Sequence, residues 1–143
     1  MLLRSIICFV FIGVLVSYSS AAFGQEYVIV VHKEFKDAAI SAKELRRIFL
    51  GKAKRWPDGR TVLVAYNCND VSHEQFSRNL VHKSPGQLNT FWRRSLYSGR
   101  SVLPYQADNS EQLLAYLKRN KNAIGYLSRS DLRDPFKEVR ITP

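Results

Sequence analysis

The chain has 143 residues, of which 45% are hydrophobic, and a formal net charge of +10 at pH 7. This length supports one hydrophobic core of ordinary size and excludes two full domains. The excess of lysine and arginine attracts anions such as phosphate esters, acidic polysaccharides or lipid head groups. The same charge can simply keep a domain soluble, so both interpretations stay open.

The first 24 residues have the order of a secretory signal peptide. A charge at Arg4 is followed by an apolar run, residues 6–16, and by small residues ending at Gly24. The run is shorter than the roughly 20 residues that span a bilayer, which disfavours the alternative of a permanent anchor. We therefore expect export of residues 25–143, without stable membrane insertion and without a nucleic-acid partner. Cleavage removes only one charge, so the mature domain keeps +9.

Only one of the two cysteines, Cys68, lies in the expected mature domain. An intramolecular disulfide is therefore excluded, and the fold must rest on packing. A free cysteine is more often a small buried hydrophobic residue than a nucleophile, and we interpret Cys68 in that way.

The first half of the mature chain predicts a strand, a helix and a second strand. Residues 27–31 form a continuous, mostly β-branched run, typical of a strand covered on both faces. A capping box at residues 41–44 begins a helix that Gly51 ends. Residues 56–59, with proline and glycine, predict a tight turn, and residues 61–65 predict the second strand.

The second half predicts three helices and two strands. Capping boxes at residues 72–75 and 84–87 indicate two consecutive helices, the latter with proline at its first position. A further helix over residues 111–120 would be capped by Asp108 or Ser110. Short apolar runs predict a strand at residues 123–127 and an edge strand at residues 139–141. This order favours a single α/β domain in which helices flank a sheet.

The chain lacks the usual motifs of catalysis and cofactor binding. The histidines do not have the spacing of a zinc site, and the adjacent residues Ser72, His73 and Glu74 point in different directions on a helix. No nucleophile elbow, phosphate-binding P-loop or dinucleotide-binding motif is present. We therefore expect no catalytic residue, no metal and no cofactor, and a protein that is not an enzyme.

The segment 67–72 is the most informative candidate site. It follows a predicted strand directly, and in an open α/β sheet ligands sit where such strands lead into helices. The hydroxyl and amide groups of Ser72 and Asn69 could bind an anion there. The alternative is that Ser72 only caps its own helix, and Asp70 would repel an anion. A basic stretch between Arg46 and Arg55 could dock an acidic partner or form a solvated face.

Several motifs together resemble one family. The segment S-A-K-E-L-R-R-I-F-L-G-K followed by W-P-D-G resembles a conserved stretch of phosphate-type periplasmic solute-binding proteins, the substrate-binding components of phosphate ABC transporters. An aromatic helix and a strand of the family are matched further along. These motifs occupy, in the family's order, residues 41–52, 56–59, 91–99 and 122–127.

The resemblance implies a type II periplasmic-binding-protein fold, here as a single lobe with a mixed sheet flanked by helices. It implies an exported periplasmic domain, residues 25–143, that binds phosphate or another small anion as an accessory to ABC-type phosphate uptake. Ser72 matches a hydroxyl residue of the family's phosphate loop, with Asn69 as its companion. Ser41, at the start of the first helix, is the third candidate ligand-binding residue.

A second interpretation stays open. The family's phosphate loop carries an arginine and glycines that residues 65–72 lack. The lobe could therefore be a ligand-free structural or interaction protein of the cell envelope that contacts a transporter or a porin. If it instead pairs with itself to rebuild a two-sided cleft, exposed aromatic residues such as Trp56 or Tyr105 would mark the contact.

Overall fold

The structure is a computed structural model that describes residues 26–37, 39–99 and 102–143. The predicted signal peptide, residues 1–24, lies outside the described residues. Among the helices that are described, none is both long enough and apolar enough to cross a bilayer.

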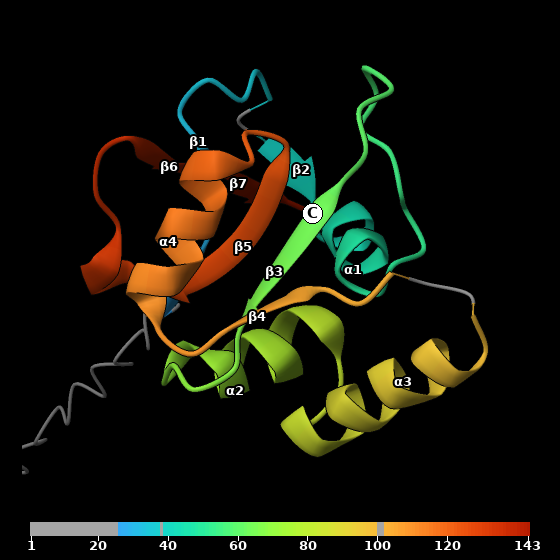
Figure 1. The fold of residues 1–143 in the computed structure, drawn as a ribbon. Coiled ribbons are helices and arrows are strands. Elements are labelled where there is room, and N and C mark those ends of the chain that lie inside the picture. The colour runs from blue at the N-terminus through green and yellow to red at the C-terminus, as the bar shows by residue number, and fades with distance from the viewer. Residues whose placement is uncertain (1–25, 38, 100–101) are drawn as a thin grey trace, which may run out of the picture.

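A five-stranded mixed sheet forms the centre of the molecule (Figure 1), in the order β4-β3-β5-β1-β6. β3 runs parallel to both β4 and β5, whereas β1 runs antiparallel to β5 and β6. β2 and β7 form a separate parallel pair. The strands are β1 (Tyr27–His32), β2 (Ala39–Ser41), β3 (Leu63–Asn67), β4 (Tyr105–Ala107), β5 (Ala123–Ser128), β6 (Phe136–Glu138) and β7 (Arg140–Thr142).

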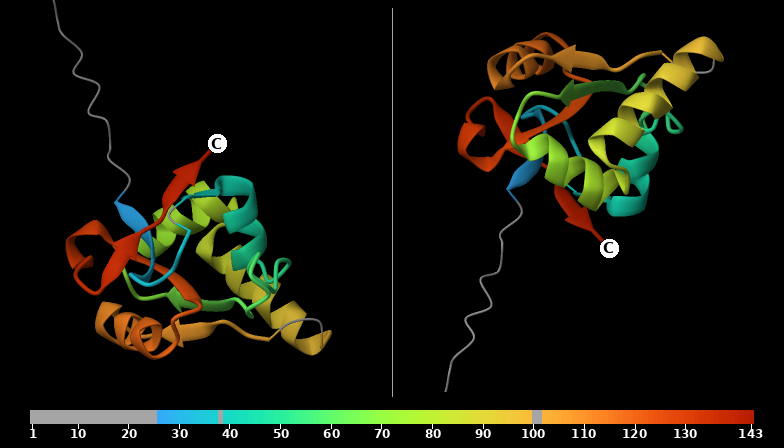
Figure 2. Two further views of the ribbon diagram at one scale, coloured as in Figure 1. Left: turned by 90° about the horizontal axis from the view of Figure 1, so that it is seen from above. Right: turned by 90° about the horizontal axis from the view of Figure 1, so that it is seen from below.

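Helices cover both faces of this sheet. α1, α2 and α3 pack on one face and α4 on the other, as the views along the sheet show (Figure 2). A π-helical turn, Ser77–Val81, continues α2 toward α3. The helices are α1 (Ala42–Phe49), α2 (Ser72–Phe76), α3 (Pro85–Tyr97) and α4 (Ser110–Arg119), with a short 3₁₀ turn at Arg129–Asp131.

The continuous apolar run of β1 is explained by these two layers. All six of its residues are buried. Tyr27, Ile29 and Val31 point into the core beneath α1–α3, while Val28 and Val30 point into the core beneath α4. Because side chains alternate along a strand, a strand between two helix layers needs apolar residues at every position. The fold class predicted from the sequence, a mixed α/β sheet flanked by helices, is confirmed.

Helix starts follow the sequence at α1 and α3 and depart from it at α2, described below, and at α4. Ser84 and Gln87 form the complete capping box at α3. At α1, Ser41 accepts a hydrogen bond from the Glu44 amide at 3.1 Å, as predicted, although the Glu44 side chain pairs with Arg47 instead. α4 is capped by Asn109, so the prediction of Asp108 or Ser110 was wrong.

The structure also corrects the predicted exposure of Trp56 and the predicted set of strands. Trp56, expected on the surface, is only 5% exposed, and its indole N–H donates to the Asn122 carbonyl at 2.8 Å. The expected edge strand near the C-terminus is β7, which pairs with β2 outside the main sheet. β2, β4 and β6 were not predicted, because three residues are too few to show an alternating pattern.

Gly125 lies where α4 packs closely on the sheet. A Cβ atom there would lie 3.1 Å from a Leu113 methyl group and 3.3 Å from the Ala65 carbonyl oxygen. We expect Gly125→Ala to lower the free energy of unfolding by about 1–3 kcal/mol, measured by urea denaturation. Gly86→Ala is the control, since nothing lies within 4 Å of its added Cβ. In a helix it should be neutral or stabilising by up to about 1 kcal/mol.

Candidate functional site

Three parallel strands end at the same edge of the sheet. β4, β3 and β5 lead at this edge into the start of α4, the start of α2 and the 3₁₀ turn, respectively. Ligands of open α/β sheets bind outside such carboxyl ends, so this edge is the candidate site. Asn67 closes β3 and is fully buried, with its side-chain amide donating to the Ser110 hydroxyl at 3.1 Å.

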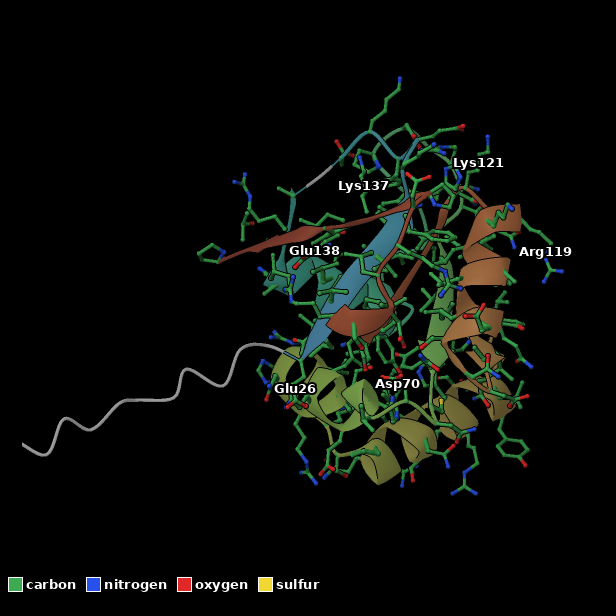
Figure 3. The ribbon with its side chains drawn as sticks, turned by 90° about the vertical axis from the view of Figure 1, so that its left-hand side faces the viewer. Glu26, Asp70, Arg119, Lys121, Lys137 and Glu138 are labelled. Atoms are coloured by element: carbon green, nitrogen blue, oxygen red, sulfur yellow. The ribbon has the colours of Figure 1, made fainter. Side chains whose placement is uncertain are left out.

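The carboxylate of Asp70 gathers donors from all three strand ends. It accepts hydrogen bonds from the Ser72 amide at 2.8 Å, the Ser128 hydroxyl at 2.7 Å and the Ser110 hydroxyl at 3.3 Å. Figure 3 shows Asp70 at this edge, between α2 and α4. Burial works to raise the pKa of Asp70, but these hydrogen bonds outweigh it and hold the pKa below its ordinary value. Donors suited to an external anion are therefore already bound to the chain's own carboxylate.

Ser72 does not cap α2, which corrects the predicted capping box. It lies inside the first turn, fully buried, and its hydroxyl makes no well-formed hydrogen bond to any described residue. Asp70, two residues earlier, accepts the hydrogen bond from the Ser72 amide that the capping box assigned to the Gln75 side chain. Asn69 is exposed, and its side chain donates weakly to the Asp108 carbonyl at 3.4 Å.

Ser41 lies in a different hollow from this edge. Its hydroxyl caps α1, and the residue borders a depression of about 370 Å³ together with Glu44, Arg55 and Trp56. Ser72 and Asn69 therefore lie close to each other after β3, whereas Ser41 lies at a different hollow.

A pocket of about 380 Å³ opens beside the Asp70 cluster, and sequence reasoning did not find it. It lies between the ends of β3 and β4, the start of α2 and the first turns of α3. Neither Asn69, Ser72 nor Ser41 lines it. The residues that do are Tyr66, Cys68, His73, Pro85, Gly86, Leu88, Asn89, Trp92, Pro104 and Gln106.

The protonation of His73 follows from its neighbours. The Asn67 amide donates to the Tyr126 hydroxyl at 3.1 Å, so that hydroxyl is an acceptor there. The Tyr126 hydroxyl can then donate its own hydrogen bond to His73 Nδ1, 2.5 Å away. Desolvation lowers the pKa of His73, although Asp70 opposes this, which favours the neutral ring at pH 7. Nδ1 is therefore an acceptor, and Nε2 carries the proton and is a donor.

No acidic or basic side chain stands among the lining residues, apart from this neutral histidine. Cys68 is exposed rather than buried, which corrects our interpretation of it. Partial burial raises the pKa of its thiol, so the thiolate that nucleophilic chemistry needs is disfavoured. No metal-binding group of histidine, cysteine, aspartate or glutamate side chains occurs in the described part of the chain. The pocket offers neutral hydrogen-bond donors and apolar walls.

Comparison with known proteins finds structural relatives only. No family model and no curated protein matches the sequence. A phosphate ABC transporter substrate-binding protein from Clostridium perfringens, solved with bound phosphate, superposes with a TM-score of 0.63 at 19% identity, over 81% of this chain and 44% of that one. An ABC-type phosphate transport receptor from Vibrio cholerae gives 0.56 at 13%, over 81% and 46%. PstS from Borrelia burgdorferi gives 0.60 at 10%, over 82% and 47%.

The chain has a periplasmic-binding-protein fold. The resemblance to phosphate-type binding proteins, read from short motifs, is thus confirmed at the level of the fold. The chain spans less than half the length of these three proteins. In a chain with this fold, the carboxyl edge with its pocket is the part of the surface to test for a ligand.

Asp70 should be important for stability. We expect Asp70→Ala to lower the free energy of unfolding by about 2 kcal/mol, because two serine hydroxyls and an amide at a helix start lose their acceptor. Its carboxylate has a lowered pKa, so its contribution is present above the ordinary value of 3.8 and is lost as the pH falls through the lowered one. Asp108→Ala, an exposed neighbour, is the control for urea denaturation. An equal loss in both variants would contradict the Asp70 network.

His73 should make stability depend on pH near neutrality. Because its pKa is lower in the folded state, the unfolded chain binds more protons, and stability falls as the pH drops below about 6.5. The loss should stay below about 1 kcal/mol, since the ring is only partly buried. Urea denaturation between pH 7.5 and pH 5 should show a smaller loss in His73→Gln than in the original protein. Unchanged pH dependence in that variant would assign the effect to other groups.

Proposed function

We propose that this chain is an exported, periplasmic solute-binding-protein-like domain that binds phosphate or another small oxyanion, as an accessory to ABC-type phosphate uptake. The ligand would lie in the His73 pocket. The fold, which it shares with phosphate-binding proteins, and the net positive charge support this proposal. Its specific support is the donor that Tyr126 fixes at His73.

The donors around the pocket suit an oxyanion. His73 Nε2–H is the first, because its tautomer leaves this proton unused by Tyr126. The Gly86 amide is the second, since it lies in the first turn of α3, where amides have no partner within the helix. The side-chain amides of Asn89 and Gln106 add donors at the exposed rim. Neutral donors at a helix start can hold an anion without a countercharge.

The charge near the pocket predicts which anions bind best. Asp70 stays ionised beside His73, and no lysine or arginine lines the pocket. A monoanion should therefore bind better than a dianion of similar size. The positive charge of the whole domain would still raise the local concentration of either.

Calorimetric titration of the mature domain with phosphate, sulfate and a small phosphate ester at low salt tests this function. We expect saturable one-to-one heat, and an affinity about tenfold or more lower in His73→Leu, because a charge-assisted donor is lost. His73→Gln should restore part of the affinity, since its amide can donate. His82→Asn is the control: this exposed histidine ends the π-helical turn in a left-handed conformation that asparagine tolerates.

Two further variants separate the pocket from the earlier candidates. Ser41→Ala and Asn69→Ala should leave the affinity unchanged if the ligand lies in the pocket. A loss in Asn69→Ala with none in His73→Leu would move the site to the segment after β3. Thermal denaturation of each variant checks that the domain is folded.

The alternative function is a ligand-free structural or interaction protein of the envelope, with a transporter or a porin as partner. The observation that favours it is the Asp70 cluster, where the chain's own carboxylate holds the donors at the strand ends. Absence of heat with every anion tested, in a folded protein, would support this alternative over the first proposal.

A further inference from the structure

The end of α3 and the segment that follows it carry four of the five large hydrophobic residues that are exposed in the described part of the chain. Tyr97 and Val102 are 88% and 91% exposed, and Leu96 and Leu103 are 49% and 42% exposed. We call these four residues the α3 tip. The fifth, Val71, lies on the segment after β3.

The tip projects beyond the core rather than covering it. Only Leu88 and Trp92 of α3 are buried, so the helix is anchored through its first two thirds. Its C-terminal end extends away from the sheet, as two directions of view agree (Figures 1 and 2). On the segment that follows, Val102 and Leu103 also border a hollow of about 200 Å³ that residues of α1 and β3 help to line.

Positive charge accompanies the tip. Between Glu74 and Asp108 the sequence has no acidic residue, while it has five lysines and arginines. Arg93 and Arg94 are exposed in the last turns of α3, and neither forms an ion pair with a described residue. Their guanidinium groups are therefore available to anions next to the apolar side chains.

We propose that the α3 tip docks the domain on an anionic phospholipid surface. Tyrosine is favoured at the level of lipid head groups, and aliphatic side chains bury in the adjoining acyl region. Arginine side chains beside them can extend to lipid phosphates while their stems pack on the apolar residues. A projecting helix end with apolar side chains beside two arginines fits a bilayer surface, where acyl chains and lipid phosphates lie at adjoining depths. This binding is peripheral and does not depend on the His73 pocket.

Vesicle cosedimentation of the mature domain tests the proposal. We expect binding to equimolar phosphatidylglycerol and phosphatidylcholine vesicles that weakens as salt rises, and little binding to phosphatidylcholine alone. The double variant Tyr97→Ser with Val102→Ser should lower the partition coefficient about tenfold or more, because two apolar side chains no longer enter the interface. Val71→Ser is the matched control, since Val71 is 78% exposed but lies elsewhere.

A second pair of variants separates the tip from general charge attraction. Arg93→Gln with Arg94→Gln should reduce binding by about thirtyfold, at roughly 1 kcal/mol for each charge. The same change at Lys118 and Arg119, two exposed cations of α4, should have a smaller effect. Equal losses in the two pairs would mean that net charge alone drives vesicle binding, and this result would overturn the proposal.

Two further results bear on the source of binding. His73→Leu should leave vesicle binding unchanged, and a loss in that variant would assign lipid phosphate to the pocket instead of the tip. No binding to anionic vesicles would overturn the proposal and favour an acidic protein as the partner of this surface. Neither result depends on whether phosphate itself binds.

Discussion

The hydroxyl of Tyr126 is the interaction on which the candidate site depends. Tyr126 lies in the central strand β5, with its ring stacked on Phe76 of α2 at 3.7 Å between centroids. Its hydroxyl accepts a hydrogen bond from the Asn67 amide, the last amide of β3, and is hydrogen-bonded to His73 Nδ1. A buried tyrosine without such partners would cost several kcal/mol, so the strand end and the helix start are held to it together. The orientation and the tautomer of His73 follow from that requirement.

The same edge of the sheet contains two different environments a few residues apart. At Asp70 the donors from three strand ends are satisfied by a carboxylate of the chain, which makes the cluster a structural element. At the His73 pocket the donors face an open volume and have no charged partner among the lining residues. One edge of the sheet thus has a part whose donors are satisfied by Asp70 and a part whose donors are available to a ligand.

The sequence predicts the parts of this fold that local patterns encode. The apolar run of β1, the capping box of Ser84 and Gln87, and the strand β5 were all found, because each depends on neighbours along the chain. The site was not found in the same way. Ser110 and Ser128, which bind Asp70, lie 40 and 58 residues from it, and Tyr126 lies 53 residues from His73. Helix geometry excluded a shared function of the adjacent Ser72, His73 and Glu74, but it could not identify Tyr126 as the partner of His73.

The lining of the His73 pocket limits how the proposed ligand can be held. Small-molecule sites usually bury most of the ligand and bind it through a few precisely placed polar groups. In the described part of this chain the pocket offers neutral donors beside an ionised Asp70. Weak, rapidly reversible binding of an oxyanion is what such a site can supply. Attachment to a membrane through the α3 tip would compensate in part, because confinement to a surface raises the effective concentration of the domain near a membrane-embedded partner. Modest affinity and surface attachment together suit an accessory to transport better than a free carrier that must capture its solute alone.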